Sequence, residues 1–167
     1  EHSLLISYVS CMIAERMGIE DPDLKVKLSV AGFLHNIILK DNDKLKSFEV
    51  NVVKSQSLEQ KELKFFHAHP LVAAQLVKQI KDLPSGIAEI VSQHHELPDG
   101  TGFPQGLDAS RIATPSAIFI VAHCFVDEIY RNKFKKEIFH NILFELKPIF
   151  KSGHFAKVYD ALLKIGH

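Results

Sequence analysis

Apolar residues recur along this chain at intervals of three and four, the spacing of one face of an α-helix. Runs of alternating β-branched residues, which indicate strands, are absent from the sequence. The pattern therefore predicts an all-α fold of about seven helices in a single domain, 1–167. The helices that we expect cover approximately 3–17, 23–39, 57–68, 70–80, 86–95, 115–131, 134–147 and 154–165.

Residues typical of helix ends support several of these limits. Gly18 follows the first helix as a C-terminal glycine does. Ser57, with Gln60 three positions later, forms a capping-box pattern. Pro70 suits the first turn of a new helix, and Thr114 suits an N-cap. The polar stretch 40–56 is expected to be a long loop that covers a site.

Composition excludes some classes of function. The net charge is zero and the cations are spread along the chain, which argues against a nucleic-acid partner. No apolar run approaches the ~18 residues of a membrane span, so we expect no membrane insertion of this domain. Cys11 and Cys124 lie in apolar stretches without metal-type spacing, which favours buried, reduced thiols and a cytoplasmic protein. The start lacks a signal-peptide pattern, as expected of a domain cut from a longer protein.

Ten histidines are many for a chain of this length. The most informative stretch is 94–104, which reads His-His-Glu-Leu-Pro-Asp-Gly-Thr-Gly-Phe-Pro. Histidine is the commonest metal ligand near neutral pH, and the glycines and proline that follow are turn-forming residues. A surface pair of histidines is the simpler alternative. The adjoining carboxylate and constrained loop favour a functional site.

This run resembles the signature of HD-GYP domains, which has Tyr where this chain has Phe103. The resemblance implies an all-α HD-type domain and a metal-dependent phosphodiesterase that opens cyclic di-GMP. It extends over essentially the whole chain, through a His-Asn pair at 35–36 and a His-Pro pair at 69–70. By resemblance, the metal ligands are His2, His35, Asn36, His69, His94, His95 and His123. Taken alone, His35 and His123 could instead be core histidines bonded to backbone carbonyls.

Three positions differ from the family in charge. Asn36 stands where the family has a metal-bridging Asp, and His123 stands where it has an Asp ligand. Leu39 replaces a lysine that can contact a substrate phosphate. Two missing anions leave two dications less compensated, so we expect one metal site to be kept and the second weakened. Imidazole ligands suit transition metals, here one or two ions of Fe, Mn, Zn or Ni.

Two functions remain open. One is a divergent HD-GYP domain of bacterial cyclic di-GMP signalling that binds metal with phosphodiesterase activity weak or lost, and the other is an active enzyme with altered ligands. A purely structural relic is a third, less favoured alternative. The resemblance implies cyclic di-GMP or a related nucleotide as ligand, and diguanylate-cyclase-type domains as partners of the Gly-Phe-Pro loop. The catalytic candidates are Asn36 in degenerate form, Glu96 and Asp99, and the candidates for the substrate or partner loop are Asp99, Gly100, Gly102, Phe103, Pro104 and Arg131.

Overall fold

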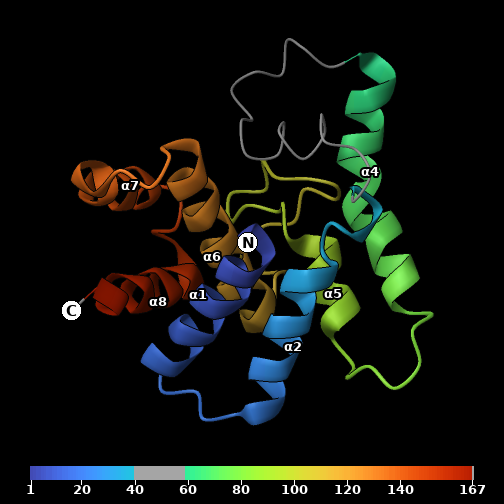
Figure 1. The fold of residues 1–167 in the computed structure, drawn as a ribbon, viewed down its shortest axis with the longest axis horizontal. Coiled ribbons are helices and arrows are strands. Elements are labelled where there is room, and N and C mark those ends of the chain that lie inside the picture. The colour runs from blue at the N-terminus through green and yellow to red at the C-terminus, as the bar shows by residue number, and fades with distance from the viewer. Residues whose placement is uncertain (40–58, 167) are drawn as a thin grey trace.

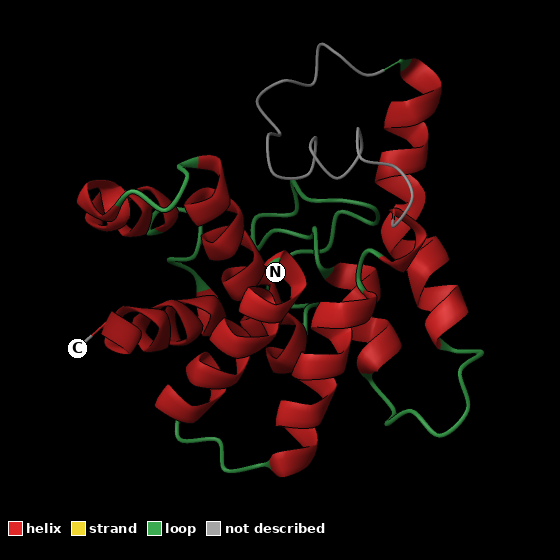
Figure 2. Ribbon diagram, in the orientation of Figure 1, coloured by secondary structure: helices red, strands yellow, loops and turns green. Residues whose placement is uncertain are grey.

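The computed structural model of the protein describes residues 1–39 and 59–166. Within these ranges it holds seven α-helices and no strand, which confirms the predicted all-α class (Figure 2). The α-helices are α1 (His2–Arg16), α2 (Pro22–Leu34), α4 (Gln60–Val77), α5 (Ile87–Gln93), α6 (Thr114–Arg131), α7 (Phe139–Leu146) and α8 (Gly153–Leu163). Short 3-10 helices are η1 (Ile37–Leu39), η3 (Lys136–Ile138) and η4 (Lys164–Gly166).

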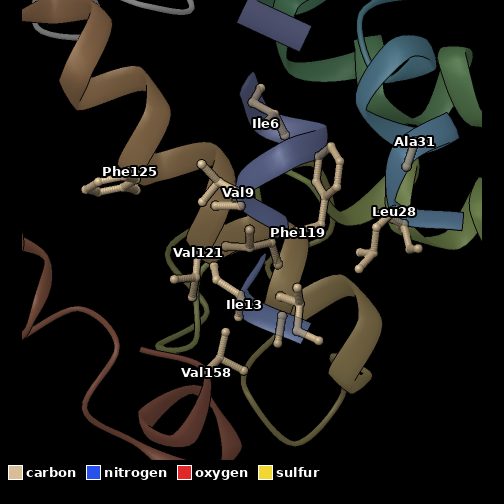
Figure 3. Packing of buried hydrophobic residues seen from close by; sticks show 14 of the residues in the cluster. Ile6, Val9, Ile13, Leu28, Ala31, Phe119, Val121, Phe125 and Val158 are labelled. Carbon is tan, nitrogen blue, oxygen red and sulfur yellow. The ribbon is translucent and has the colours of Figure 1, made fainter. Parts of the chain in front are cut away.

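Helix α6 lies at the centre of the core because its sequence is apolar on nearly every side. Its residues from Ala117 to Ala122 are all fully buried. Figure 3 shows Ile6, Val9 and Ile13 of α1 packed around this part of α6, with Val158 of α8 below them. Helices α1, α5 and α8 all contact α6. The central helix thereby fixes the positions of the elements around it.

The helices are arranged so that several ends meet in one region. In Figure 1, α1 and α2 run side by side, α4 lies at one edge, and α7 and α8 lie at the opposite edge. Helix α5 packs against α2, α4 and α6. The start of α1 and the ends of α2 and α5 lie close together, because histidines on them make ring contacts. This end of the bundle is where the candidate site forms.

The predicted helix 23–39 is too long. Helix α2 ends at Leu34, the chain turns at His35 and Asn36, and η1 follows. The apolar pattern continues through the turn because Leu39 is also buried, so periodicity alone did not locate the helix end. The predicted loop 40–56 lies outside the described residues.

The predicted break before Pro70 is wrong, because α4 is continuous and holds this proline inside it. The predicted capping box is also displaced. Ser57 lies outside the described residues, and the helix instead begins after Glu59, whose backbone N–H donates to the Glu62 carboxylate at 2.8 Å.

Other limits differ by smaller amounts. Ala113, not Thr114, is the N-cap of α6. The predicted helix 134–147 is shortened to α7, because Lys133 and Phe134 adopt left-handed backbone angles after α6. Gly18 has a φ of 74°, as predicted for a residue just past the end of α1. None of the described helices is long and apolar enough to cross a membrane.

Candidate metal centre

Six histidines from five helical elements converge on one region. His2 opens α1, and His35 and the pair His94–His95 directly follow α2 and α5. His69 and His123 lie within α4 and α6. The ring centroids of neighbouring members are 4.2 Å apart for His94–His95 and 5.0–5.3 Å apart for His69–His94, His69–His95, His35–His94, His35–His123, His94–His123 and His95–His123. The structure therefore brings together all the histidines that the sequence predicted as metal ligands.

Three of these rings are oriented in the same way. The Nδ1 atoms of His35, His69 and His94 contact the carbonyl oxygens three residues earlier, at 2.8, 2.5 and 2.7 Å. A carbonyl oxygen only accepts, so Nδ1 must carry the hydrogen and donate it. In the neutral imidazole Nε2 then holds the lone pair. The backbone thus fixes Nε2 as the metal-binding atom of all three rings.

Pro70 explains how this orientation is possible inside α4. A proline has no N–H, so it cannot bond the carbonyl four residues earlier, which belongs to Phe66. That carbonyl instead accepts the bond from the His69 Nδ1–H. The His-Pro pair therefore works within one continuous helix, because the ring of the histidine satisfies the carbonyl that the proline leaves unpaired.

The contact between His69 and His94 tests whether a cation fits here. Their Nε2 atoms lie 3.0 Å apart, and both Nδ1 atoms already donate to carbonyls. Two lone pairs at this distance repel each other unless a proton or a metal ion lies between them. Burial, and then the neighbouring His95, hold the pKa of His94 well below its usual value, which disfavours the proton. The donor set therefore fits a metal ion.

His95 completes this group. Ligand atoms of His69, His94 and His95 all lie within 4.8 Å of one another, and this is the one cluster of that kind in the described part of the chain. His94 and His95 reach the same point because α5 ends at Gln93. On a continuing helix, adjacent side chains would diverge by ~100°. The structure thus provides three imidazole ligands for one ion.

The remaining ligand candidates adjoin this group. His35 and His123 are almost fully buried, and Asn36 is partly exposed next to His35. His2 is the outermost ring, 6.3 Å from His35 and 6.0 Å from His123 by ring centroids. Burial lowers the pKa of His123 from 6.5 to about 4, against the opposing effect of Asp127. This pKa keeps the ring neutral at pH 7, as a metal ligand must be.

Asp127 was not predicted from the sequence. Its carboxylate lies 2.7 Å from His2 Nε2 and 3.2 Å from His123 Nδ1. It follows His123 by four residues on α6, so both side chains share one helix face. That spacing could have indicated it, but an Asp-His pair is common on helices and carried no signal by itself.

Glu96 organises the loop after the paired histidines. Its buried carboxylate accepts hydrogen bonds from the backbone N–H groups of Gln105 at 2.7 Å and Leu107 at 2.8 Å. A Cβ added to Gly102 would lie 2.3 Å from Leu97 N and 2.5 Å from Glu96 Cα, so only glycine fits at this position. The geometry gives Glu96 a positioning role, and its predicted catalytic role stays a prediction.

Phe103 lies over the metal-ligand group. Its ring stacks on His95 at 4.5 Å and on the exposed His67 at 4.7 Å, with interplanar angles of 23° and 22°. The loop therefore covers one side of His95 and limits the access of water. Pro104 follows through a cis peptide bond, and the positive φ of Gly100 lets the loop turn back.

Two further predicted residues are held by contacts within their own segments. Asp99 is exposed and accepts hydrogen bonds from the N–H and hydroxyl of Thr101, which lower the pKa of its carboxyl. Arg131 ends α6 and pairs with Glu128 one turn before it. Their predicted roles toward catalysis or substrate stay predictions.

Leu39 is fully buried beside Phe66, with Ile38, Leu63 and Phe103 packed around them. It forms a small apolar cluster next to the site, at the position where the resemblance implied a lysine. The side chain at this position therefore contributes packing and no positive charge.

Sequence comparisons with known proteins identify relatives of this chain. A family model described as HD domain matches residues 2–138. Over 124 residues the chain is 27% identical to the 3'3'-cGAMP-specific phosphodiesterase 3 of Vibrio cholerae, covering 74% of this chain and 25% of that protein. Over 121 residues it is 25% identical to the cyclic di-GMP phosphodiesterase response regulator RpfG of Xanthomonas campestris, covering 72% and 30%. The chain thus spans between a quarter and a third of the length of these relatives.

The fold agrees as well. The structure is similar to Bd1817, a HDG"Y"P protein from Bdellovibrio bacteriovorus, with a TM-score of 0.74 and 22% sequence identity. The match covers 98% of this chain and 51% of that one. The chain belongs to the HD domain family.

Proposed function

We propose that this domain binds a transition metal ion through His69, His94 and His95, and that it binds a cyclic dinucleotide with hydrolysis weak or absent. The observation that carries the proposal is the 3.0 Å approach of the His69 and His94 Nε2 atoms. Their Nδ1 atoms are committed to backbone carbonyls, so both lone pairs point at one place. Imidazole ligands favour Fe, Mn, Zn or Ni over Ca or Mg.

The chain's own residues hold the ligands in place before any ion binds. Carbonyl bonds set the ring planes of His69 and His94, and the stacked Phe103 ring holds His95. Glu96 accepts two backbone hydrogen bonds from the loop that carries Phe103. When bound, a metal ion of this kind polarises a phosphodiester and lowers the pKa of a coordinated water. Such an arrangement supports phosphodiester hydrolysis if charge compensation is sufficient.

Charge compensation is the weak part of the site. Asn36 offers a neutral oxygen, and His123 brings no negative charge. A second dication close to the first is therefore less well stabilised. Leu39 provides no cation for a phosphate, since it is buried against Phe66. Losing one well-placed electrostatic group commonly costs about a hundredfold to a thousandfold in rate. Slow or absent turnover follows, and an active enzyme with altered ligands is the alternative.

The ligand class comes from the relatives, whose names specify cyclic di-GMP and 3'3'-cGAMP as substrates. The chain spans a minor part of each of these proteins. We propose that it is the C-terminal output domain of a longer protein. The Gly-Phe-Pro loop is the proposed surface for a diguanylate-cyclase-type partner. Thr101 and Gln105 are exposed on it, whereas the Phe103 ring faces inward.

The metal is tested by elemental analysis of protein purified without added metal. We expect at least one equivalent of a transition metal in the parent protein. The double variant His94→Ala with His95→Ala should lose most of it while staying folded. The matched control is His140→Ala, which removes an exposed histidine of α7. Equal metal content in the folded double variant and the control would refute the site.

Hydrolysis is tested separately with cyclic di-GMP and 3'3'-cGAMP. The parent should bind at least one of them, with turnover far below the ~1 per second of ordinary enzymes. Asn36→Asp with His123→Asp restores two carboxylates and should raise both the metal content and the rate. Parent turnover at an ordinary enzymatic rate would establish the alternative, an active phosphodiesterase.

A further inference from the structure

The Asp127 carboxylate joins two histidines that are 121 residues apart in the chain. Its side chain is 10% exposed and lies on α6, one turn after His123. One oxygen contacts His2 Nε2 at 2.7 Å, and the other lies 3.2 Å from His123 Nδ1. The His2 ring also contacts the Tyr130 ring edge-on, at a centroid distance of 4.9 Å. Asp127 is thereby placed between the rim of the site and its buried part.

These contacts determine which nitrogen of each ring can face an ion. His2 Nε2 donates a hydrogen bond to the carboxylate, and the 3.2 Å approach of His123 Nδ1 to the second oxygen favours a hydrogen on that nitrogen too. The lone pair of neutral His123 is then on Nε2, the same atom as in His35, His69 and His94. For His2, the contact takes up Nε2 instead. The two rings therefore serve different purposes toward the site.

We propose that Asp127 is a positioning residue that orients His123 as a ligand and supplies one of the two negative charges that Asn36 and His123 no longer bring. His2 acts through it, as the second donor that keeps the carboxylate in place. This inference rests on the proposed metal-binding function. Carboxylates that accept a hydrogen bond from a ligating histidine fix its tautomer and raise its basicity. Here the carboxylate stands one helical turn away from the position where the family has its aspartate.

Burial supports this assignment over a surface ion pair. Removing a carboxylate from water costs several kcal/mol unless hydrogen bonds and a nearby positive charge compensate for it. His2 donates one hydrogen bond to the carboxylate, and the Nδ1 of His123 lies 3.2 Å from its other oxygen. A cation bound by the neighbouring rings would supply the positive charge.

The first test is the tautomer of His123 in metal-free protein, measured by long-range ¹H–¹⁵N NMR of the imidazoles. The resonance is assigned by its loss in His123→Gln. We expect the Nδ1–H form in the parent protein and the Nε2–H form in Asp127→Ala. The control Glu128→Gln removes one negative charge from the next residue and should leave the tautomer unchanged. A parent protein with His123 in the Nε2–H form would overturn the proposal without any variant.

The second test is zinc affinity, measured by competition with a chelating dye. Loss of a carboxylate behind a ligating histidine typically weakens metal binding by about 10–100-fold, and we expect this for Asp127→Ala. Asp127→Glu should recover part of the loss, and Glu128→Gln should bind as the parent does. Unchanged affinity in Asp127→Ala overturns the role of Asp127 alone. Absence of binding of zinc, iron, manganese and nickel alike by the parent would refute the proposed function, while the tautomer still tests the orientation of His123.

Discussion

Replacing Glu96 by Gln separates a positioning role from a catalytic one. The two carboxylate oxygens each accept one backbone N–H, from Gln105 and Leu107. Glutamine keeps one of these acceptors and turns an NH₂ group toward the other N–H. The variant therefore loses one hydrogen bond to a charged acceptor and leaves a backbone donor unpaired. Because Leu107 N and the Glu96 side chain are buried, water cannot replace the lost partner without opening the loop.

The magnitude follows from these contacts. A hydrogen bond to a charged group contributes about 1.5–3 kcal/mol, and an unsatisfied buried donor costs about 1–3 kcal/mol. Both values describe the loss of the same contact and do not add in full, so we expect the free energy of unfolding to fall by about 2–4 kcal/mol. For a chain of this size the midpoint of thermal unfolding should fall by about 4–16 °C. Urea unfolding of metal-free protein, followed by circular dichroism, measures the loss.

The control is Glu145→Gln, which removes the same charge from an exposed position on α7. It should change stability by less than about 0.5 kcal/mol. If Glu96→Gln unfolds as the parent does but abolishes hydrolysis, Glu96 acts in the chemistry and the positioning role is wrong. If stability and metal affinity fall together, the carboxylate serves the loop that carries Phe103.

Three further changes test other parts of the structure. Pro70→Ala restores a backbone N–H that competes with the His69 ring for the Phe66 carbonyl. We therefore expect zinc affinity to fall, while helix α4 becomes up to about 3 kcal/mol more stable. An unchanged zinc titration would contradict the role of the proline. Leu39→Lys buries an ammonium group in an apolar cluster, so the free energy of unfolding measured in urea should fall by at least about 3 kcal/mol. An unchanged free energy of unfolding would mean that the new side chain reaches water. Burial lowers the pKa of His123 to about 4, so the unfolded chain binds more protons below pH 6.5. The free energy of unfolding of metal-free protein should therefore be highest above about pH 6.5 and fall toward pH 4, with about 3 kcal/mol of the fall due to this residue. A constant free energy of unfolding between pH 7 and 5 would contradict the burial of His123.

Local spacing in the sequence was sufficient to predict the helices and the histidines. Apolar residues at helical intervals predicted elements close to α1, α5, α6 and α8, because burying one helix face is a local constraint on residue order. The 94–104 run indicated the site, because its histidines, glycines and proline are contiguous. The convergence of the other four histidines followed from resemblance to a known family, and periodicity alone would not have grouped them.

Only the tertiary structure decided which residues distant in sequence contact each other. Whether Leu39 faces a substrate or a core depends on Phe66, which comes from another helix. The role of Glu96 depends on two N–H groups that lie nine and eleven residues later and reach it only because the loop folds back. Asp127 gains its significance from His2 at the other end of the chain. Sequence patterns encode which face of an element is buried, whereas the partner that meets a buried polar group is set by how the helices pack.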